Sequence, residues 1–443
     1  MTSFCIARYL SNGDLDNTFG DSGKVIIDMS DDNQITQSLA VSIGGDDSIL
    51  VCGSIGGSGV GIAHIRPNGD LLNIHFGSEA KFTNLFMENQ TSPRVRKVLI
   101  AQGRQVSAGE NVAGENISPQ SQPYLATAEF ASSTSSVASS FGPRVVAIGD
   151  VGDLSVQRFV AASLYTTNGQ LDPSFGSDGN VLLGVSSSLV TAKAAAFSPI
   201  QNRTVVIVDR DDDSLPILHA IRFLSDGSPD ANFGVNGRTN ITLFSDDDGA
   251  WIIEPRDTVI RNGEIIIAGN GILPGSQDLA VIRLKEDGPE DLSFGDNGVS
   301  IAPFGGFSSA NSVKTDARTR IVTAGFANRS FALARFLPNG RLDQDFNQQG
   351  MVITPFDEGE SEAFVAKVDS PGTERIVAGG RAGGQFALAR YLDNGSLDPA
   401  FGTNGRVHTV ISDEFDSNVL DIAFDNRRRI IAAGSIFTTP PIG

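Results

Sequence analysis

One stretch of sequence recurs along the chain and limits the fold more than any other feature. The segment ARYLSNGDLDNTFGDSGKVII at residues 7–27 returns as IRFLSDGSPDANFGVNGRTNI at 221–241, as ARFLPNGRLDQDFNQQGMVI at 334–353 and as ARYLDNGSLDPAFGTNGRVHT at 389–409. A repeat unit of this size cannot bury its own apolar face, so each unit must stack on its neighbours. The recurrence therefore predicts a single domain over residues 1–443 and leaves the function open.

The apolar residues of each unit come in short runs bounded by Gly, Asn and Asp, which is typical of short β-strands. Each unit contains four such segments. They are exemplified in order by EAFVAKVD, by the Ala-Gly segment IIIAG, by the Ala-Arg-Tyr segment FALARYL, and by the Gly-x-Val segment GMVITPF. Four antiparallel strands in radial repetition describe one blade of a β-propeller. The sequence thus predicts an all-β propeller.

The number of blades follows from counting these segments. Eight Ala-Gly and eight Ala-Arg-Tyr segments predict eight blades, with seven as the alternative. The unit with segments at 105–109 and 124–130 lacks the NGxLDxxFG turn, so residues 110–142 are expected to form an irregular, degenerate blade. The first two strands of the chain are expected to share a sheet with the last two, which would close the ring and hide its edges.

The repeat wording ARYxxNGxLDxxFGxxGxV resembles the delta-60 repeat, a bacterial β-propeller repeat of unknown function. The resemblance covers nearly the whole chain, but the second unit has Ala80 at the position of the last Gly, and the third unit lacks the turn. The resemblance implies a propeller and implies no known activity.

The balance of charge excludes some classes of partner. A formal charge of −19 argues against a nucleic acid and against an anionic membrane surface. No run of 18 apolar residues is present, so no spanning helix is expected. Because the repeat begins at Phe4 without a signal peptide, a cytoplasmic location is the default expectation, and secretion stays open. The oligomeric state is left open.

Arginine in the Ala-Arg-Tyr segment and aspartate in the Leu-Asp turn occur together. The second unit has lost both, with His64 and Leu72 in their places. This joint loss indicates that the two side chains interact, and we expect an ion pair that pins each turn to its strand. The predicted pairs are Arg8–Asp16, Arg222–Asp230, Arg283–Asp291, Arg335–Asp343 and Arg390–Asp398.

Acidic residues gather in the connections that follow the Gly-x-Val and Ala-Gly segments. Successive connections of an antiparallel blade alternate between the two faces of the ring, so these connections share one face. The acidic residues expected there are Asp31, Asp32, Asp211, Asp212, Asp213, Asp246, Asp247, Asp248, Asp357, Glu358, Asp413 and Asp416. The opposite face is expected to receive Arg104, Arg203, Arg318, Arg320 and Arg427 to Arg429.

This acidic face predicts attraction of a cationic partner or of divalent ions; a rim that only solvates the protein is the alternative. Weak calcium binding by Asp246 to Asp248 is one form of the prediction, and no other metal or cofactor is expected.

The sequence carries no recognised catalytic motif. None of the four histidines has metal-ligand spacing from another, and no GxSxG turn or P-loop is found. We therefore expect a non-enzymatic scaffold that presents the acidic face to a protein or other extended partner. One alternative is a hydrolase or lyase with a site near the central channel, because a propeller can assemble a site from several blades. Another is a carbohydrate-binding propeller, which a single Trp and four Tyr disfavour.

Overall fold

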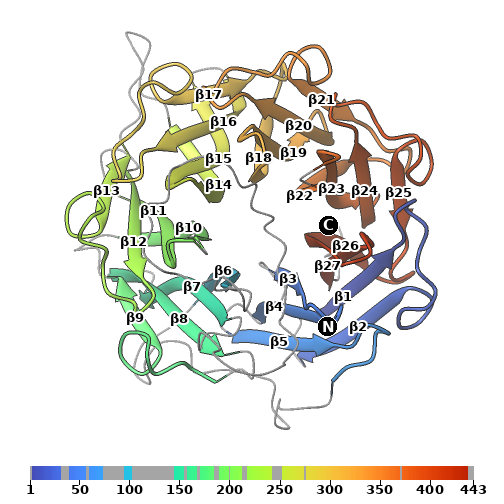
Figure 1. The fold of residues 1–443 in the computed structure, drawn as a ribbon, viewed down its shortest axis with the longest axis horizontal. Coiled ribbons are helices and arrows are strands. Elements are labelled where there is room, and N and C mark those ends of the chain that lie inside the picture. The colour runs from blue at the N-terminus through green and yellow to red at the C-terminus, as the bar shows by residue number, and fades with distance from the viewer. Residues whose placement is uncertain are drawn as a thin grey trace, which may run out of the picture.

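The fold is a closed ring of β-sheets. The computed structural model describes residues 2–30, 39–55, 59–72, 94–101, 144–153, 157–166, 170–183, 189–198, 200–211, 217–241, 252–273, 276–369 and 372–437. Within these ranges the strands form seven sheets around a central axis (Figure 1). The prediction of an all-β propeller is confirmed.

Six blades place four strands in radial order, and the described part of blade 1 has the first three. The innermost strands are β3 (Leu39–Ile43), β6 (Arg94–Ala101), β10 (Leu189–Ser198), β14 (Ile252–Arg261), β18 (Ser308–Thr315), β22 (Ser361–Asp369) and β26 (Asp416–Phe424). The second strands, from the Ala-Gly segments, are β4 (Ile49–Ile55), β7 (Arg144–Asp153), β11 (Arg203–Asp211), β15 (Glu264–Leu273), β19 (Ile321–Ala327), β23 (Arg375–Ala382) and β27 (Ile430–Phe437).

The third strands, from the Ala-Arg-Tyr segments, are β5 (Gly59–Ile65), β8 (Gln157–Thr166), β12 (Ile217–Leu224), β16 (Ser276–Leu284), β20 (Ser330–Phe336), β24 (Gln385–Tyr391) and β1 (Thr2–Tyr9). The outermost strands are β9 (Asn180–Leu183), β13 (Arg238–Ile241), β17 (Val299–Ala302), β21 (Met351–Thr354), β25 (Arg406–Thr409) and β2 (Lys24–Ser30). We number the blades 1 (β3–β5), 2 (β6–β9), 3 (β10–β13), 4 (β14–β17), 5 (β18–β21), 6 (β22–β25) and 7 (β26, β27, β1 and β2).

Blade 7 closes the ring with strands from both ends of the chain. Its sheet has the order β2-β1-β27-β26. Strand β1 pairs antiparallel with β27, so that Cys5 lies opposite Gly434 and Arg8 opposite Ile431. The predicted sharing of one sheet by the two ends is therefore confirmed. The same pairing buries the free thiol of Cys5.

The prediction of eight blades is wrong, and the alternative count of seven is correct. Strand β6 pairs directly with β7 in the order expected of first and second strands of one blade. The two segments counted as an extra unit, 105–109 and 124–130, fall in the chain between these paired strands. They lie outside the described residues, as does the 110–142 segment. Counting sequence motifs overestimated the blades because neighbouring strands of one sheet can be far apart in sequence.

The hydrophobic core lies between adjacent blades. One cluster joins Phe4 and Ile6 of blade 7 to Val41 and Val51 of blade 1. Others join blades 2 and 3, blades 3 and 4, and blades 5 and 6 in the same way. Each sheet is apolar on both sides because it is covered on both sides, which explains the continuous apolar runs in the sequence.

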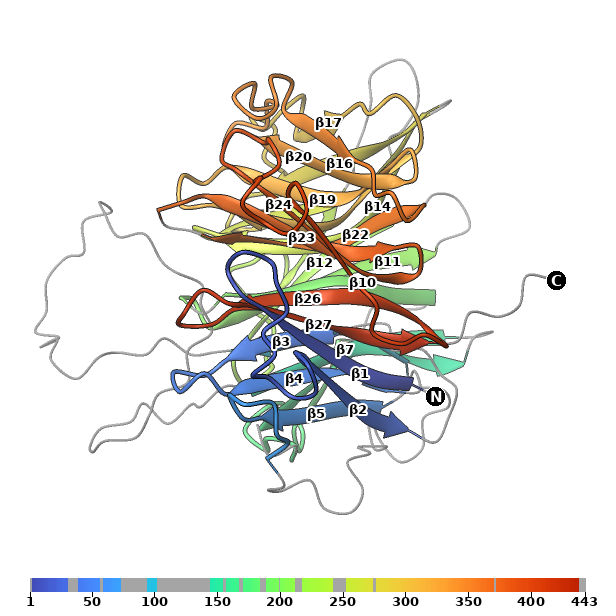
Figure 2. The same ribbon diagram turned by 90° about the vertical axis from the view of Figure 1, so that its right-hand side faces the viewer.

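The strands connect at two faces of the ring, seen to either side of the strands in Figure 2. The turn face holds the connections between first and second strands and the NGxLDxxFG turns between third and fourth strands. The loop face holds the connections between second and third strands and the crossings from one blade to the next. The start of β1 at Thr2 and the end of β27 at Phe437 lie at the loop face.

Candidate functional site

In the repeated NGxLDxxFG turn, an arginine of the third strand contacts both the aspartate and the Phe of the turn. In each predicted pair the guanidinium Nε donates to Oδ2 of the aspartate, at 2.8 Å for Arg8–Asp16, 2.9 Å for Arg222–Asp230, Arg283–Asp291 and Arg390–Asp398, and 2.7 Å for Arg335–Asp343. The same guanidinium lies 4.5–4.7 Å above the Phe ring of the turn. The structure thus brings together all five pairs inferred from the sequence, and a ring stacks on each of them.

The turn also joins each blade to the next. Arg222 Nη1 donates to the Glu286 carbonyl of blade 4 at 2.5 Å, and Arg283 Nη1 to the Pro338 carbonyl of blade 5 at 2.6 Å. A backbone bond accompanies it, such as Gly402 N–H to Asn12 O at 2.7 Å. Equivalent backbone bonds occur at every junction that the described turns form. The repeat therefore holds neighbouring blades together as well as shaping its own turn.

The Asn-Gly step is required by this close approach. Gly395 has a φ of +83°, and a Cβ there would lie 2.8 Å from the backbone nitrogen of Asn347 in the preceding blade. Gly340 and Gly69 face the preceding blade in the same way. Glycine is needed both for the left-handed conformation and for the space.

Further arginines on the turn face lie in or next to the connections between first and second strands. Arg203, Arg375 and Arg429 contact the turn aspartates Asp230, Asp398 and Asp16 at 2.8, 3.3 and 3.1 Å. Arg320 contacts Asp316 at 2.5 Å. The arginines expected opposite the acidic face are thus on the turn face, but their charge is balanced by carboxylates there. Arg104 lies outside the described residues.

These contacts favour the ionised form of two turn carboxylates, those of Asp16 and Asp291. Burial raises the pKa of Asp16, but the bonds from Thr18 and the charge of Arg8 outweigh burial and lower the pKa below its usual value. The pKa of Asp291 is lowered for the same reasons, with Ser293 and Arg283 as partners. Asp16 and Asp291 are therefore structural anions.

Blades 1 and 2 depart from the pattern. Leu164 replaces the arginine in blade 2, although Asp172 is kept and accepts from Ser174 Oγ at 2.6 Å. Phe175 packs edge-on against Phe223 of blade 3, with ring centroids 5.8 Å apart. At the junction of blades 2 and 3, a contact between two aromatic rings therefore takes the place of the arginine-to-carbonyl bond made by Arg222, Arg283 and Arg390 at their junctions.

Most of the described acidic residues of the loop face lie in or next to the crossings from blade 5 to blade 6 and from blade 6 to blade 7. Asp357, Glu358 and Asp413 are exposed, and Asp416 is partly buried. Asp211 ends β11. The remaining acidic residues expected on this face are Asp31, Asp32, Asp212, Asp213, Asp246, Asp247 and Asp248, and they lie outside the described residues.

Neutral groups hold the loop that carries Asp413 in shape. The Gln385 side chain donates to the carbonyls of Ser412 and Phe415 at 3.1 and 3.0 Å. Its oxygen accepts from the Ile411 N–H at 3.1 Å and from the Ser417 hydroxyl at 3.0 Å. One side chain thus fixes both ends of the 410–416 loop, and the carboxylates of this loop are presented by a preformed frame.

A concavity adjoins the same acids. It has a volume of about 740 Å³ and follows the outermost strand of blade 6, with Asp357 and Glu358 on one side and Lys24 of blade 7 on the other. His408 lies in it, 3.7 Å from Glu358. The size is within the range of small-molecule sites, and the lining is mostly polar and charged.

The innermost strands carry charges that sequence reasoning missed. Lys314 Nζ of blade 5 donates to Asp257 Oδ2 of blade 4 at 2.9 Å. Asp421 of blade 7 accepts from the Val41 N–H of blade 1 at 2.8 Å. Burial raises the pKa of Asp421, against the opposing charge of Lys367, whose own pKa burial lowers. The sequence did contain a signal for these charges, because four of the chain's seven lysines (Lys97, Lys193, Lys314 and Lys367) lie in segments that form innermost strands.

Neither a metal-ligand cluster nor a membrane-spanning helix occurs in the described ranges. Among these residues no group of three or more His, Cys, Asp or Glu side chains is placed to hold a metal ion. Nor does any described helix have the length and apolar character needed to cross a bilayer.

Comparison with known proteins identifies a family with a similar repeat but gives no activity. The family described as "Domain of unknown function (DUF5122) beta-propeller" matches residues 2–19, 320–346 and 375–401. Each of the three matched ranges contains the arginine, the turn aspartate and the stacked Phe described above. No curated protein matches the sequence significantly.

Solved structures with similar arrangements are distant in sequence. Prolyl oligopeptidase B from Galerina marginata, bound to a 35mer substrate, has 10% identity and a TM-score of 0.41 over 88% of this chain, which spans 46% of that enzyme. The GH43 endo-arabinanase from Bacillus licheniformis has 12% identity and a TM-score of 0.33, covering 77% of this chain and 97% of its own. The chain is a seven-bladed β-propeller with repeats similar to those of a propeller family of unknown function.

Proposed function

We propose that this propeller is a non-enzymatic binding scaffold that presents its acidic loop face to a cationic protein or other extended partner. One observation carries the proposal. The buried aspartates of the complete turns are paired with arginines, whereas Asp357, Glu358, Asp413 and Glu414 of the loop face are exposed. Exposed carboxylates on a rigid frame attract and orient a cationic partner at little cost in conformational entropy.

The preformed loops support the same proposal. Gln385 fixes the 410–416 loop, and the Ser361 N–H donates to the Arg329 carbonyl at 2.9 Å across the neighbouring loops. Function on propellers and other rigid frames is commonly carried by such connections. The concavity beside Asp357 and Glu358 would give an extended partner a place to lie.

Poly-L-lysine is a suitable extended cationic probe, with binding measured by calorimetry at low ionic strength. The test variant is D357N/E358Q/D413N/E414Q. Its control is D21N/D178N/D296N/D345N, which removes the same amount of charge from exposed positions on the turn face. Because each exposed ion pair contributes about 0.2–1 kcal/mol, the loop-face variant should bind about tenfold more weakly. Equal weakening in the two variants would reduce the effect to overall charge and refute the proposal.

A second function, a hydrolase or lyase with a site near the central channel, is favoured by one observation. Lys367 and Asp421 are desolvated on neighbouring innermost strands, and burial shifts both toward their neutral forms. Perturbed pairs of this kind are characteristic of acid–base chemistry. Screening wild type and K367A against a panel of hydrolase and lyase substrates tests it, since turnover that K367A retains would exclude this site.

A further inference from the structure

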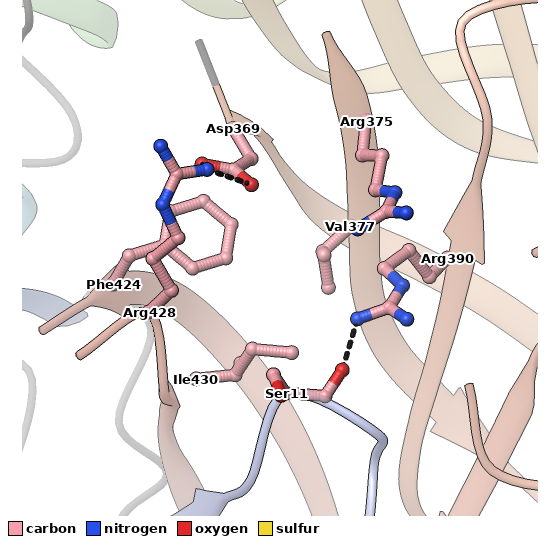
Figure 3. Close-up of a pocket in the computed structure, with 8 residues that line it drawn as sticks. All are labelled: Ser11, Asp369, Arg375, Val377, Arg390, Phe424, Arg428 and Ile430. Atoms are coloured by element: carbon pink, nitrogen blue, oxygen red, sulfur yellow. Dashed lines mark hydrogen bonds and ion pairs between the residues drawn. The ribbon is translucent and has the colours of Figure 1, made fainter. Parts of the chain in front are cut away.

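A small pocket on the turn face lies between blades 6 and 7 (Figure 3). Arg375 and Arg390 stand on one side of it, and the ion pair of Arg428 with Asp369 stands on the other. Val377 and Ile430 supply apolar surface between them. The volume is about 60 Å³, far below the range of about 300–1,000 Å³ for drug-sized ligands.

The preceding junction, between blades 5 and 6, shows what such a pocket accommodates. There the Asp393 carboxylate accepts from Arg320 Nη2 at 2.6 Å, from Arg335 Nη1 at 2.8 Å and from Arg318 Nη1 at 3.2 Å. Three guanidinium groups thus surround one carboxylate. The carboxylate comes from the turn of the following blade.

The two junctions have equivalent positions. Asp393 directly precedes Asn394-Gly395, and Ser11 directly precedes Asn12-Gly13. The backbone carbonyl of each accepts from the arginine of the preceding blade, Arg335 in one case and Arg390 in the other. Arg320 directly precedes the second strand of blade 5 and Arg375 begins that of blade 6, and each is followed by Ile. Ser11 therefore occupies the place of Asp393, and the blade 7 turn supplies no carboxylate to its pocket.

Among the described residues that line this pocket, three are arginines and one, Asp369, is an acid. Asp398 serves both Arg375, at 3.3 Å, and Arg390, at 2.9 Å. Arg428 contacts Asp369 at 2.9 Å. Three guanidinium groups thus meet two carboxylates. Glu374, buried next to Arg375 in sequence, lines no part of the pocket.

We infer that the pocket formed by Arg375, Arg390 and Arg428 binds a carboxylate group supplied by a ligand. A planar carboxylate matches the fork of an arginine, and the bond is strengthened because both partners are charged. The apolar surface of Val377 and Ile430 suits the carbon attached to that carboxylate. The ligand is a small carboxylic acid or an acidic side chain of an extended partner. The site is on the opposite face from the acidic loops and is independent of the function proposed above.

The test measures the melting temperature of the full chain with 1–100 mM acetate, at constant ionic strength maintained with sodium chloride. Acetamide is the uncharged control ligand. We expect a saturable rise with acetate, with a Kd near the millimolar range because so small a ligand has few atoms to contribute, and no rise with acetamide. No saturable rise with acetate would overturn the inference.

Ser11→Asp should place the missing carboxylate in the pocket. It should raise the melting temperature without acetate and weaken acetate binding at least tenfold. The matched control is Ser225→Asp, which alters the equivalent turn position of blade 3, opposite Leu164 in place of an arginine. This control should change acetate affinity less than twofold. Acetate binding unchanged by Ser11→Asp would place the ligand elsewhere and overturn the inference.

Arg428→Gln is a second variant that should leave the fold intact, because its side chain is 56% exposed. It should weaken acetate binding at least fivefold, and unchanged affinity would remove Arg428 from the site. The source of the carboxylate is distinguished with the capped peptide acetyl-Gly-Glu-Gly-amide. Competition between peptide and acetate indicates an acidic side chain, whereas binding of acetate alone indicates a free small acid.

Discussion

The two faces of the ring use the same residue type in opposite ways. On the turn face, Asp16 and Asp343 are buried, and each is shared by an arginine of its own blade and by groups that fix the turn. On the loop face, Asp357 and Asp413 are exposed, and the shape of their loops depends on neutral groups such as Gln385. Repetition in the sequence thus marks the carboxylates that hold the ring together, and variation marks the exposed ones that we propose to contact a partner.

The largest expected difference between the faces lies in the cost of breaking an ion pair. Arg335→Leu leaves Asp343 buried without its main partner, so the free energy of unfolding should fall by about 3–5 kcal/mol. Glu360→Leu breaks the pair with Arg329 at 2.6 Å, whose side chains are 69% and 79% exposed, and should cost about 1 kcal/mol or less. Denaturant unfolding measures both. Equal costs would show that the buried pair does not stabilise the ring.

The second comparison concerns glycine. Gly395→Ala introduces a Cβ 2.8 Å from the Asn347 nitrogen as well as an unfavourable φ, whereas Gly305 on the loop face has a similar φ of +74° and nothing within 4 Å. Strain in the left-handed region costs about 1 kcal/mol or more, and the turn-face variant should lose roughly 1–3 kcal/mol beyond Gly305→Ala. If the two variants melt alike, close approach between blades does not explain the Asn-Gly step.

A third difference concerns how the stability contributed by a turn-face carboxylate depends on pH. Burial raises the pKa of Asp393, but the bond from Arg320 and the charges of Arg320, Arg335 and Arg318 outweigh it, so the folded-state pKa is lowered. A lowered pKa contributes stability that is complete above the unfolded value of about 3.9 and is lost as pH falls through the folded value. Asp393→Ser should therefore lower the melting temperature by a constant amount from pH 5 to 7. The gap between the thermal melts of the variant and wild type should narrow as the pH falls below about 4, and a gap that stays constant from pH 5 down to pH 2.5 would contradict this.

The smallest effect concerns calcium on the loop face. We expect millimolar calcium to raise the melting temperature by about 1–2 °C, as weak surface carboxylate sites bind in the range of about 10⁻⁴–10⁻³ M. The variant D246N/D247N/D248N should abolish the shift. The turn-face control D21N/D178N/D296N should keep it. Absence of any shift in wild type would end the calcium proposal.

Much of the fold follows from local pattern. The apolar runs, the turn residues and the recurrence at fixed spacing predict the strands, their order in a blade and the closure by both ends. The Arg–Asp pairs were visible because His64 and Leu72 replace both partners in one unit. The number of blades could not be predicted from the sequence, because the motifs at 105–109 and 124–130 do not show which strands pair.

Contacts between blades were also hidden from the sequence. The bond from Arg283 to the Pro338 carbonyl joins residues 55 positions apart, and neither residue type signals the other. The sequence shows that the innermost strands contain lysines. Only the packing of these strands around one axis places Lys314 against Asp257.

By itself the sequence determined that this chain repeats a four-stranded unit and that each turn carries its own arginine and aspartate. Those features are local, set by side-chain period, glycine conformation and short-range pairing. The tertiary structure alone decided that seven units close the ring, that each arginine also serves the next blade, and that Ser11 rather than an aspartate faces Arg375 and Arg390. The reason is geometric, because radial packing makes neighbours of residues that the chain separates by a whole blade or by its full length.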